Sequence, residues 1–323
     1  MTGSGRRRVG PPGPRSTASC LRRGASLVRL TCGALLVTVT PLADLAAQAR
    51  AQRVVTSSVI DAISCNETAS PLAAPRLSWR GDDVQWSEWS VRLGARAVPA
   101  RIIVVAFDPA QLRVALDLVQ KDGALAPWNL DAAPERARIA LNAGQFIDDG
   151  PWGWVVHRGR EWQPPGEGTL AGALVVDTAG AVDIVPRSAI DAWRRSAAVR
   201  EAVQSYPTLL EGDARPPAAL CAATAQVDRT HRDTRLAIGV RRDGHVIIAL
   251  SRYAGGALPD RTPIGPTTPE MAELMRRLGA VRALMLDGGL SAQLLVRGRT
   301  GAAPQRWPGL RDVPLALVVH DAR

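Results

Sequence analysis

Residues 236–250 have the sequence Leu236-Ala-Ile-Gly-Val-Arg-Arg-Asp-Gly-His-Val-Ile-Ile-Ala-Leu250. Two short apolar runs lie on either side of Arg242-Asp-Gly-His245, and Asp-Gly is a frequent turn between paired strands. The stretch therefore predicts a β-hairpin.

Nine further short runs of apolar and β-branched residues follow the same pattern, many of them separated by Gly-containing turns. They occupy residues 102–107, 114–119, 138–141, 154–156, 173–176, 182–185, 283–286, 293–296 and 314–319. Short strands at such spacing are typical of a mixed or antiparallel sheet. We expect one α+β domain over residues 80–323, with a mixed or antiparallel β-sheet core and a few helices.

Two stretches predict helices. Ser188 to about Gln204 offers Ser188 as a cap and an apolar face with Ile190 and Val203. Thr268 to Leu278 offers Thr268 as a cap, a proline at the first helical position and apolar residues at helical spacing. We expect a helix over each.

Composition limits the class of protein. The chain of 323 residues is 46% hydrophobic and 22% charged, which excludes a disordered chain, and it shows no heptad or collagen period. The formal net charge is +10, but residues 1–49 hold seven arginines and one aspartate, so only +4 remains on the folded part. This distribution does not favour a nucleic-acid partner.

Residues 1–49 predict a signal peptide. An arginine-rich start precedes an apolar run of about ten residues, too short for a stable membrane span, and then Ala47-Gln-Ala49. We expect cleavage after Ala49 and export to the periplasm or the medium, by the general or the twin-arginine route; a membrane-anchored N-terminus is the alternative. Residues 50–79 are expected to form an N-terminal extension.

Two cysteines, Cys65 and Cys221, remain in the expected mature chain. In an oxidising compartment they can form a disulfide that ties the N-terminal extension to the domain. Two separate buried thiols are the alternative.

Three segments carry polar residues at the ends of apolar runs: Asn142-Ala-Gly-Gln-Phe146, Gln204-Ser-Tyr-Pro-Thr-Leu-Leu-Glu-Gly212 and Leu284-Met-Leu-Asp-Gly-Gly-Leu-Ser291. A carboxylate after a strand, followed by two glycines, is a common way to present a catalytic group. Taken alone, Asp287-Gly is equally typical of a solvent-exposed turn.

In this order, the three segments resemble motifs of the phosphodiester glycosidase family. Pro151-Trp-Gly153 and Arg235-Leu-Ala-Ile-Gly239 are similar to two further family motifs, and the resemblance covers about residues 80–320. Leu236 and Leu290 stand where the family usually has Thr and Gly.

The resemblance implies hydrolysis of a sugar joined through C1 to a phosphodiester, on a cell-surface or extracellular polysaccharide, without a cofactor. Asp287 is expected to stabilise a cationic sugar or to activate a water, and Arg235 to hold the phosphate through its planar fork. Asn142 and Ser291 are expected to hold sugar hydroxyls or the water.

Further candidates are expected to surround the substrate. Backbone N–H groups at Gly144, Gly288 and Gly289 are expected to act as donors, with Gln145 and Asp148 as additional side chains. Trp152 and Trp154 are candidates for a sugar-stacking platform or for core residues, and His157 is a candidate to line the pocket.

Other chemistries are not favoured by the sequence. Ser291 lacks the second glycine of a nucleophile elbow, and the four histidines lack metal-ligand spacing, so no metal site is expected. Two non-enzymatic alternatives remain: a saccharide-binding or exopolysaccharide-assembly protein with the same fold, which the departures at Leu236 and Leu290 keep open, and a structural envelope protein.

Overall fold

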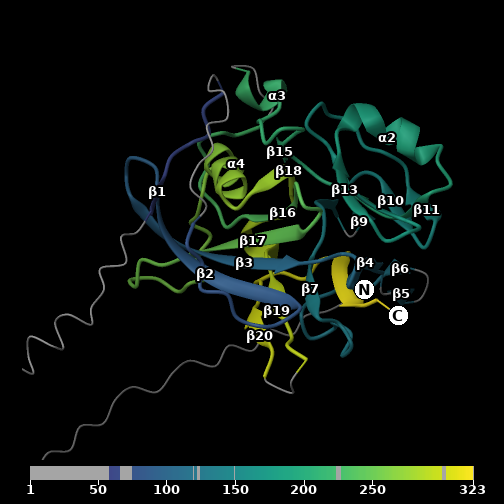
Figure 1. Ribbon diagram of the computed structural model, residues 1–323, viewed down its shortest axis with the longest axis horizontal. Helices are drawn as coiled ribbons and strands as arrows, with labels where there is room; N and C mark the ends of the chain where they lie inside the picture. Colours follow the sequence, from purple (N-terminus) through teal and green to yellow (C-terminus); the bar gives the residue numbers. More distant parts are fainter. Residues whose placement is uncertain are drawn as a thin grey trace, which may run out of the picture. The chain divides into compact units, whose positions relative to one another are not determined.

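The computed structural model describes residues 58–65, 75–118, 120–121, 124–148, 150–222, 227–299 and 303–322. These residues belong to one compact unit, Thr56–Arg323 (Figure 1). The expected signal peptide, residues 1–49, lies outside the described residues.

The largest sheet has seven strands in the order β1-β2-β3-β17-β16-β18-β15. Its strands are β1 (Ser58–Ile60), β2 (Val84–Leu93), β3 (Val98–Phe107), β17 (Val246–Tyr253), β16 (Leu236–Arg241), β18 (Ala280–Met285) and β15 (Thr208–Leu210). The predicted hairpin is confirmed, since β16 and β17 pair antiparallel with Val240 opposite Val246. Because β1 pairs with β2, part of the expected N-terminal extension contributes a strand to this sheet.

Two five-stranded sheets complete the core. One has the order β11-β10-β14-β12-β13 and the other the order β20-β19-β7-β21-β4. The first comprises β11 (Arg160–Gln163), β10 (Val155–His157), β14 (Val199–Gln204), β12 (Ala173–Asp177) and β13 (Val182–Val185). The second comprises β20 (Gln305–Trp307), β19 (Leu294–Val296), β7 (Ile139–Asn142), β21 (Ala316–Asp321) and β4 (Leu112–Asp117).

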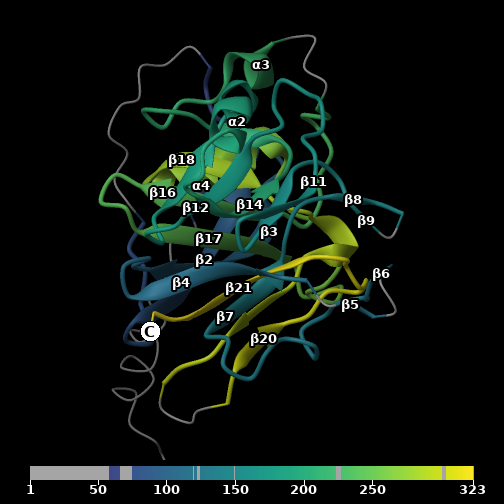
Figure 2. The same cartoon turned by 90° about the vertical axis from the view of Figure 1, so that its right-hand side faces the viewer.

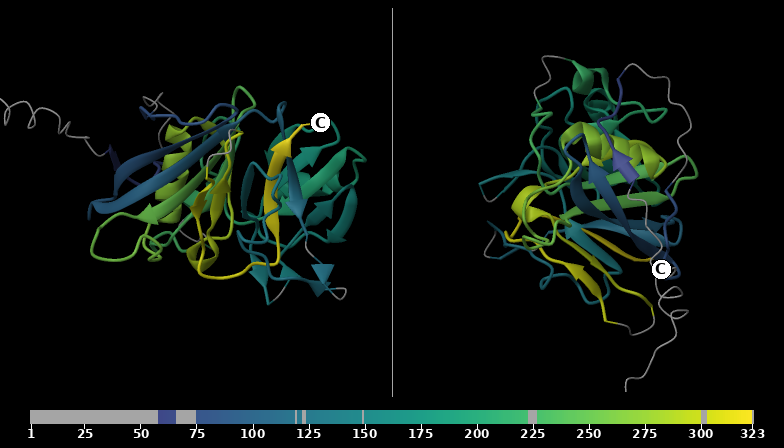
Figure 3. Two further views of the ribbon diagram at one scale, coloured as in Figure 1. Left: turned by 90° about the horizontal axis from the view of Figure 1, so that it is seen from below. Right: turned by 90° about the vertical axis from the view of Figure 1, so that its left-hand side faces the viewer.

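The second five-stranded sheet joins distant parts of the chain. The C-terminal strand β21 pairs with both β4 and β7, and Figure 3 shows it in yellow beside strands from the first half of the chain. Two short ribbons lie outside the three sheets: β5 (Gln120–Lys121) pairs with β6 (Ala124–Leu125), and β8 (Phe146–Ile147) with β9 (Gly150–Pro151).

Both faces of the seven-stranded sheet are buried along its central strands β3, β17 and β16. In β3, Ile103, Val105 and Phe107 point into a core shared with the two other sheets, whereas Ile102 and Val104 point to the opposite face. This alternation follows from the two-residue period of a strand. A strand buried on both faces needs apolar residues at every position, which explains its continuous apolar run.

Helix α4 (Thr268–Arg277) covers that opposite face and contacts β15, β16 and β18 (Figure 1). The predicted helix is confirmed, but its cap is Thr267 rather than Thr268. The Thr267 hydroxyl accepts a hydrogen bond from the Glu270 N–H, and the Glu270 carboxylate accepts one from the Thr267 N–H, which forms a capping box. Glycine at Gly279, with φ of 89°, follows the end of the helix.

The helix predicted from Ser188 to Gln204 is wrong in its second half. Helix α2 spans only Arg187–Arg194, its N-cap is Pro186, and the chain then forms β14 between β10 and β12. Val199, Ala202 and Val203 fit an apolar helix face as well as a strand, and pairing with two neighbouring strands decides for the strand. Besides α2 and α4, the described residues contain the short helix α3 (Ala218–Cys221) and the 3-10 turn η1 (Gly289–Ser291).

The described residues therefore form a sheet-rich fold with three short helices. All eleven predicted apolar runs overlap strands of the structure. None of these helices is long and apolar enough to cross a membrane.

The predicted disulfide is confirmed. Cys65, five residues after β1, is bonded to Cys221 at the end of α3, and their Cα atoms lie 5.8 Å apart. The bond closes a chain segment with a sequence separation of 156 residues.

Candidate functional site

The site begins where β7 and β18 end. Leu286 donates its N–H to the carbonyl of Leu236 and is the last residue held against β16. The chain then leaves the sheet, and the Asp287 N–H donates to the carbonyl of Ala143 at 3.1 Å. This bond places the Asp287 loop, residues 287–291, against the end of β7.

Asn142 fastens both ends of this connection. Its side chain is fully buried, Nδ2 donates to the carbonyl of Asp287 at 2.8 Å, and Oδ1 accepts from the N–H of Gln293 at 2.9 Å. Both halves of the amide are therefore bonded to backbone. Asn142 positions the Asp287 loop in this structure and does not present its amide to a ligand.

Gly288 and Gly289 let the Asp287 loop pass close to the segment that precedes β16. A Cβ on Gly288 would lie 2.6 Å from the carbonyl oxygen of Thr234, and Gly289 has φ of 57°. The Gly289 N–H donates to that same carbonyl at 2.8 Å, while the Gly288 N–H donates to the carboxylate of Asp287. These donors are thus engaged within the protein rather than directed at a ligand.

The Asp287 carboxylate is half-buried and accepts a hydrogen bond from the hydroxyl of Ser291, which is buried in η1. Burial raises the pKa of Asp287 above its ordinary value. The Ser291 hydroxyl, the Gly288 N–H and the charge of Arg311 act in the opposite direction on this pKa, and the charge of Asp233 raises it further. The structure therefore brings Asp287 and Ser291 together, with the Ser291 hydroxyl bound to the carboxylate.

A second carboxylate, Asp233, lies beside the loop. A Cβ on Gly289 would stand 3.1 Å from Asp233 Oδ2, so the bare Cα of Gly289 faces this carboxylate. Burial raises the pKa of Asp233, opposed by the charges of Arg235 and His231. Asp233 was not predicted as a site residue, because its only local signal in the sequence is its place two residues before Arg235.

Arg311 is a second residue near Asp287 that the sequence did not predict. Its backbone N–H donates to the carbonyl of Leu290 at 3.1 Å, and its guanidinium carbon lies 4.5 Å from the centre of the Phe146 ring. The side chain is exposed and lines a cavity of about 330 Å³ together with Phe146 and Asp148. No sequence motif marks Arg311. Its charge acts on Asp287 because the backbone of Arg311 is hydrogen-bonded to Leu290 of the Asp287 loop.

Arg235 is only partly available. Its Nε donates to the carbonyl of Pro266 at 3.3 Å and its Nη2 to the carbonyl of His231 at 3.0 Å. Burial lowers the pKa of Arg235, and the charge of Asp233 opposes this. Two edges of the guanidinium therefore bind backbone, and its charge lies beside Asp233.

Gly144 and Gln145 fasten the segment after Gln204. A Cβ on Gly144 would lie 2.5 Å from the carbonyl oxygen of Gln204, so only glycine fits there. Gln145 Oε1 accepts from the Ser205 hydroxyl and the Tyr206 N–H, both at 2.9 Å, and Nε2 donates to the Tyr206 carbonyl. Gln145 thus acts on the protein backbone in this structure.

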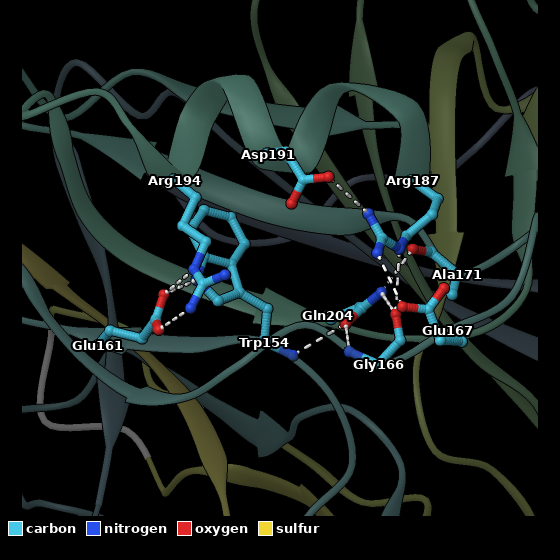
Figure 4. Close-up of polar contacts among 9 residues, drawn as sticks. All are labelled: Trp154, Glu161, Gly166, Glu167, Ala171, Arg187, Asp191, Arg194 and Gln204. Atoms are coloured by element: carbon cyan, nitrogen blue, oxygen red, sulfur yellow. Dashed lines mark hydrogen bonds and ion pairs between the residues drawn. The ribbon is translucent and has the colours of Figure 1, made fainter.

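Trp154 is a core residue, which overturns its candidacy as a sugar platform. It is 1% exposed, and its indole N–H donates to Glu161, which Arg194 also holds (Figure 4). Its backbone N–H donates to Oε1 of the fully buried Gln204, which also binds Gly166. Trp152 is half-buried, and its ring packs against Gly166.

A metal centre has no visible ligand set here. Within the described part of the chain, the structure does not gather three or more His, Cys, Asp or Glu side chains in an arrangement that could hold a metal ion.

The sequence matches a family model described as phosphodiester glycosidase over residues 135–320, more than half of the chain. The chain belongs to this family. The match includes the Asn142 segment, Arg235 and the Asp287 loop. No curated protein matches the sequence.

Solved structures support the family's fold. The catalytic domain of zebrafish N-acetylglucosamine-1-phosphodiester alpha-N-acetylglucosaminidase, auto-inhibited by its pro-peptide, aligns with a TM-score of 0.55 at 16% identity, covering 81% of this chain and 87% of that one. A hypothetical protein from Synechocystis aligns with a TM-score of 0.50 at 17% identity, covering 77% of this chain. The present chain spans 64% of the Synechocystis chain.

Proposed function

We propose that the protein is a hydrolase that releases a sugar from a glycosyl-1-phosphodiester. The observation that carries the proposal is the pairing of two carboxylates, Asp287 and Asp233, with the exposed cation Arg311, whose side chain also lines a cavity of about 330 Å³. Burial raises the pKa of each carboxylate. Perturbed carboxylates of this kind cluster at functional sites.

The chemistry of the substrate fits this set of groups. Cleavage releases a phosphate monoester, a weakly basic leaving group that needs little protonation, so the main demands are a carboxylate for the cationic sugar or the water and a cation for the phosphate. Asp287 in its ionised form meets the first demand. Arg311 meets the second through its exposed guanidinium, and Arg235 adds charge through the edge that does not bind backbone.

Asp233 is proposed as the second carboxylate of the reaction. Its charge opposes ionisation of Asp287, so the two groups favour different protonation states at the same pH. Ser291 holds the Asp287 carboxylate, and Asn142 holds the loop that carries it.

The two departures from the family motifs lie in different surroundings. Leu236 is fully buried in the shared core, and Leu290 has 48% of its surface exposed. A saccharide-binding protein without turnover is the alternative function, and it predicts binding of the same ligand without release of sugar.

We place the protein outside the cytoplasm, on a cell-surface or extracellular glycan. The Cys65–Cys221 disulfide supports this location, because such bonds persist in oxidising compartments. The arginine-rich and apolar segments of residues 1–49 supply the export signal.

A panel of sugar-1-phosphodiesters that differ in the sugar tests the proposed function. The purified protein is incubated with each member, free sugar and phosphate monoester are quantified, and binding is measured in parallel by calorimetry. We expect equal amounts of the two products from at least one member. Binding without any product would support the saccharide-binding alternative and overturn the hydrolase.

A further inference from the structure

A second polar cavity lies away from the Asp287 loop. Its volume is about 330 Å³, and its lining includes Arg113, Arg136, His157, Arg200, Glu201 and His320. Arg113 lies on β4 opposite His320 on β21, and Arg200 lies on β14. Arg136 precedes β7. Figure 2 shows β21 between β4 and β7, so the cavity draws on segments that are far apart in the sequence.

Three arginines of this cavity differ from many others in the molecule, because no carboxylate in the described part of the chain pairs with them. Arg138, Arg187 and Arg232 elsewhere in the molecule each face a carboxylate within 3.2 Å. Within the described residues, by contrast, Arg113, Arg136 and Arg200 form no ion pair. We call these three residues the arginine cluster; the same three also line an adjoining hollow with His320 and Asp321.

The nearby carboxylates are committed to other groups. Glu201 Oε2 lies 2.9 Å from His157 Nδ1, and Glu201 also accepts from two backbone N–H groups. Asp117 accepts from the indole N–H of Trp128 at 3.1 Å, and Asp321 binds Arg138 at 2.9 Å. The lining holds four arginines, Arg113, Arg136, Arg158 and Arg200, against the two carboxylates Asp117 and Glu201, so its net charge is positive.

We propose that the arginine cluster is a binding site for the phosphate group of a phosphorylated sugar. Guanidinium groups bind phosphate oxygens through charge-assisted, bidentate hydrogen bonds. The cavity has room for roughly ten water molecules, more than a lone phosphate needs. Asp117 lines the same space and can accept a further hydrogen bond from a hydroxyl group, which favours a sugar as the rest of the ligand.

This site is separate from the Asp287 loop. Pro134 and Ala137, before β7, line the cavity, whereas Ala143, after β7, binds Asp287. The extended chain from Arg138 to Ala143 spans about 17 Å at the usual rise of a strand. Binding at the arginine cluster therefore does not depend on turnover at Asp287, and its failure would leave the proposed hydrolase untouched.

Calorimetry with three probes tests the site: glucose 1-phosphate, inorganic phosphate and glucose. We expect glucose 1-phosphate to bind more tightly than inorganic phosphate and glucose not to bind. We expect a loss of about tenfold in affinity for glucose 1-phosphate in each of three variants, Arg113→Gln, Arg136→Gln and Arg200→Gln, because each removes a charge-assisted contact. Circular dichroism and thermal melting establish that each variant folds.

Two further variants give the matched controls. Arg242→Gln removes an arginine from the exposed β16–β17 turn and should bind as the parent does. Arg311→Gln removes the cation that the proposed function assigns to the phosphate, so it reports glucose 1-phosphate bound beside Asp287 instead of at the arginine cluster. Three results would each overturn the proposal. They are no binding of glucose 1-phosphate by the parent, equal binding by the three cluster variants and the parent, and loss of binding in Arg311→Gln alone.

Discussion

Asp287 is the residue at which burial and neighbouring charges act most directly on the proposed chemistry. Its pKa is raised by burial and by Asp233, and it is lowered by Ser291, Gly288 and Arg311. A carboxylate that acts in its ionised form loses activity as the pH falls through its pKa. The acid side of the pH–rate profile therefore reports on the surroundings of Asp287.

Arg311→Gln is predicted to move that acid limb to higher pH. The substitution removes a positive charge that lowers the pKa of Asp287, so the carboxylate becomes protonated at a higher pH than in the parent. The pH dependence of kcat/KM measures the shift, with Arg242→Gln as the control. An acid limb at the same pH in Arg311→Gln and the parent would show that Arg311 does not act on Asp287.

Asp287→Asn is predicted to raise stability at neutral pH. Because the pKa is higher in the folded protein than the ordinary 3.8, ionisation favours the unfolded chain at every pH above the folded pKa. The gain from Asn should shrink as the pH falls through the folded pKa towards 3.8 and vanish below it. Urea unfolding of the parent and of Asp287→Asn, from neutral pH to below 3.8, measures this difference in stability.

Asp213→Asn supplies the control for this comparison, because the Asp213 side chain is 85% exposed. It should leave stability almost unchanged across the same pH range. An Asp287→Asn variant that is less stable than the parent at neutral pH would mean that the hydrogen bonds of the carboxylate outweigh the cost of burying it.

At the scale of elements, the site depends on the junction between β7 and β18. Two hydrogen bonds connect the ends of these strands. The Asn142 amide donates to the Asp287 carbonyl, and the Asp287 N–H donates to the Ala143 carbonyl. The glycines at Gly144 and Gly288 permit close approach to backbone carbonyls on neighbouring segments. These residues therefore fix the geometry of the Asp287 loop.

Asn142→Ala is predicted to lower the free energy of unfolding by about 2–4 kcal/mol. It leaves the Asp287 carbonyl and the Gln293 N–H without their partner in a buried place. Urea unfolding measures the loss, and activity should fall with it. Asn129→Ala removes two exposed hydrogen bonds, one to Asp312 and one from the Asp131 N–H, and should cost less than about 1 kcal/mol. Equal costs for the two variants would contradict the positioning role of Asn142.

Elements differ in how well the sequence predicts them. The β16–β17 hairpin and α4 are predictable because their turn and capping residues act within a few positions. Strand β14 is not, because Val199, Ala202 and Val203 fit two periodicities and only pairing with β10 and β12 selects one. Tertiary contacts override local preference in such segments.

At the scale of the whole molecule, the residues near Asp287 differ in how far apart they lie in the sequence. Asp287 and Ser291 stand within one motif and meet in one loop. Asp233 and Arg311 come from segments without a motif, 54 residues before and 24 residues after Asp287, and only the packing of the sheets brings them to the same place. Conversely, the local pattern near Trp154 could not show that both ring faces are covered by the core.

The Cys65–Cys221 disulfide acts at the same scale, since it links the segment after β1 to helix α3. Replacing both cysteines by serine is predicted to lower the free energy of unfolding by about 2–4 kcal/mol, because the unfolded chain regains the freedom that the bond removes. Urea unfolding measures the loss, and dithiothreitol should lower the stability of the parent but not of the variant. An unchanged urea midpoint in the double variant would contradict a stabilising disulfide.

The rate of sugar release by Asp287→Asn, measured beside the parent and Asp213→Asn on a sugar-1-phosphodiester that the parent cleaves, tests the central claim most directly. The proposed role of Asp287 predicts a loss of about 10²–10⁴-fold in kcat for Asp287→Asn, with an unchanged circular dichroism spectrum, and a parental rate for Asp213→Asn. A parental rate for Asp287→Asn would contradict the assignment of Asp287 as the catalytic carboxylate.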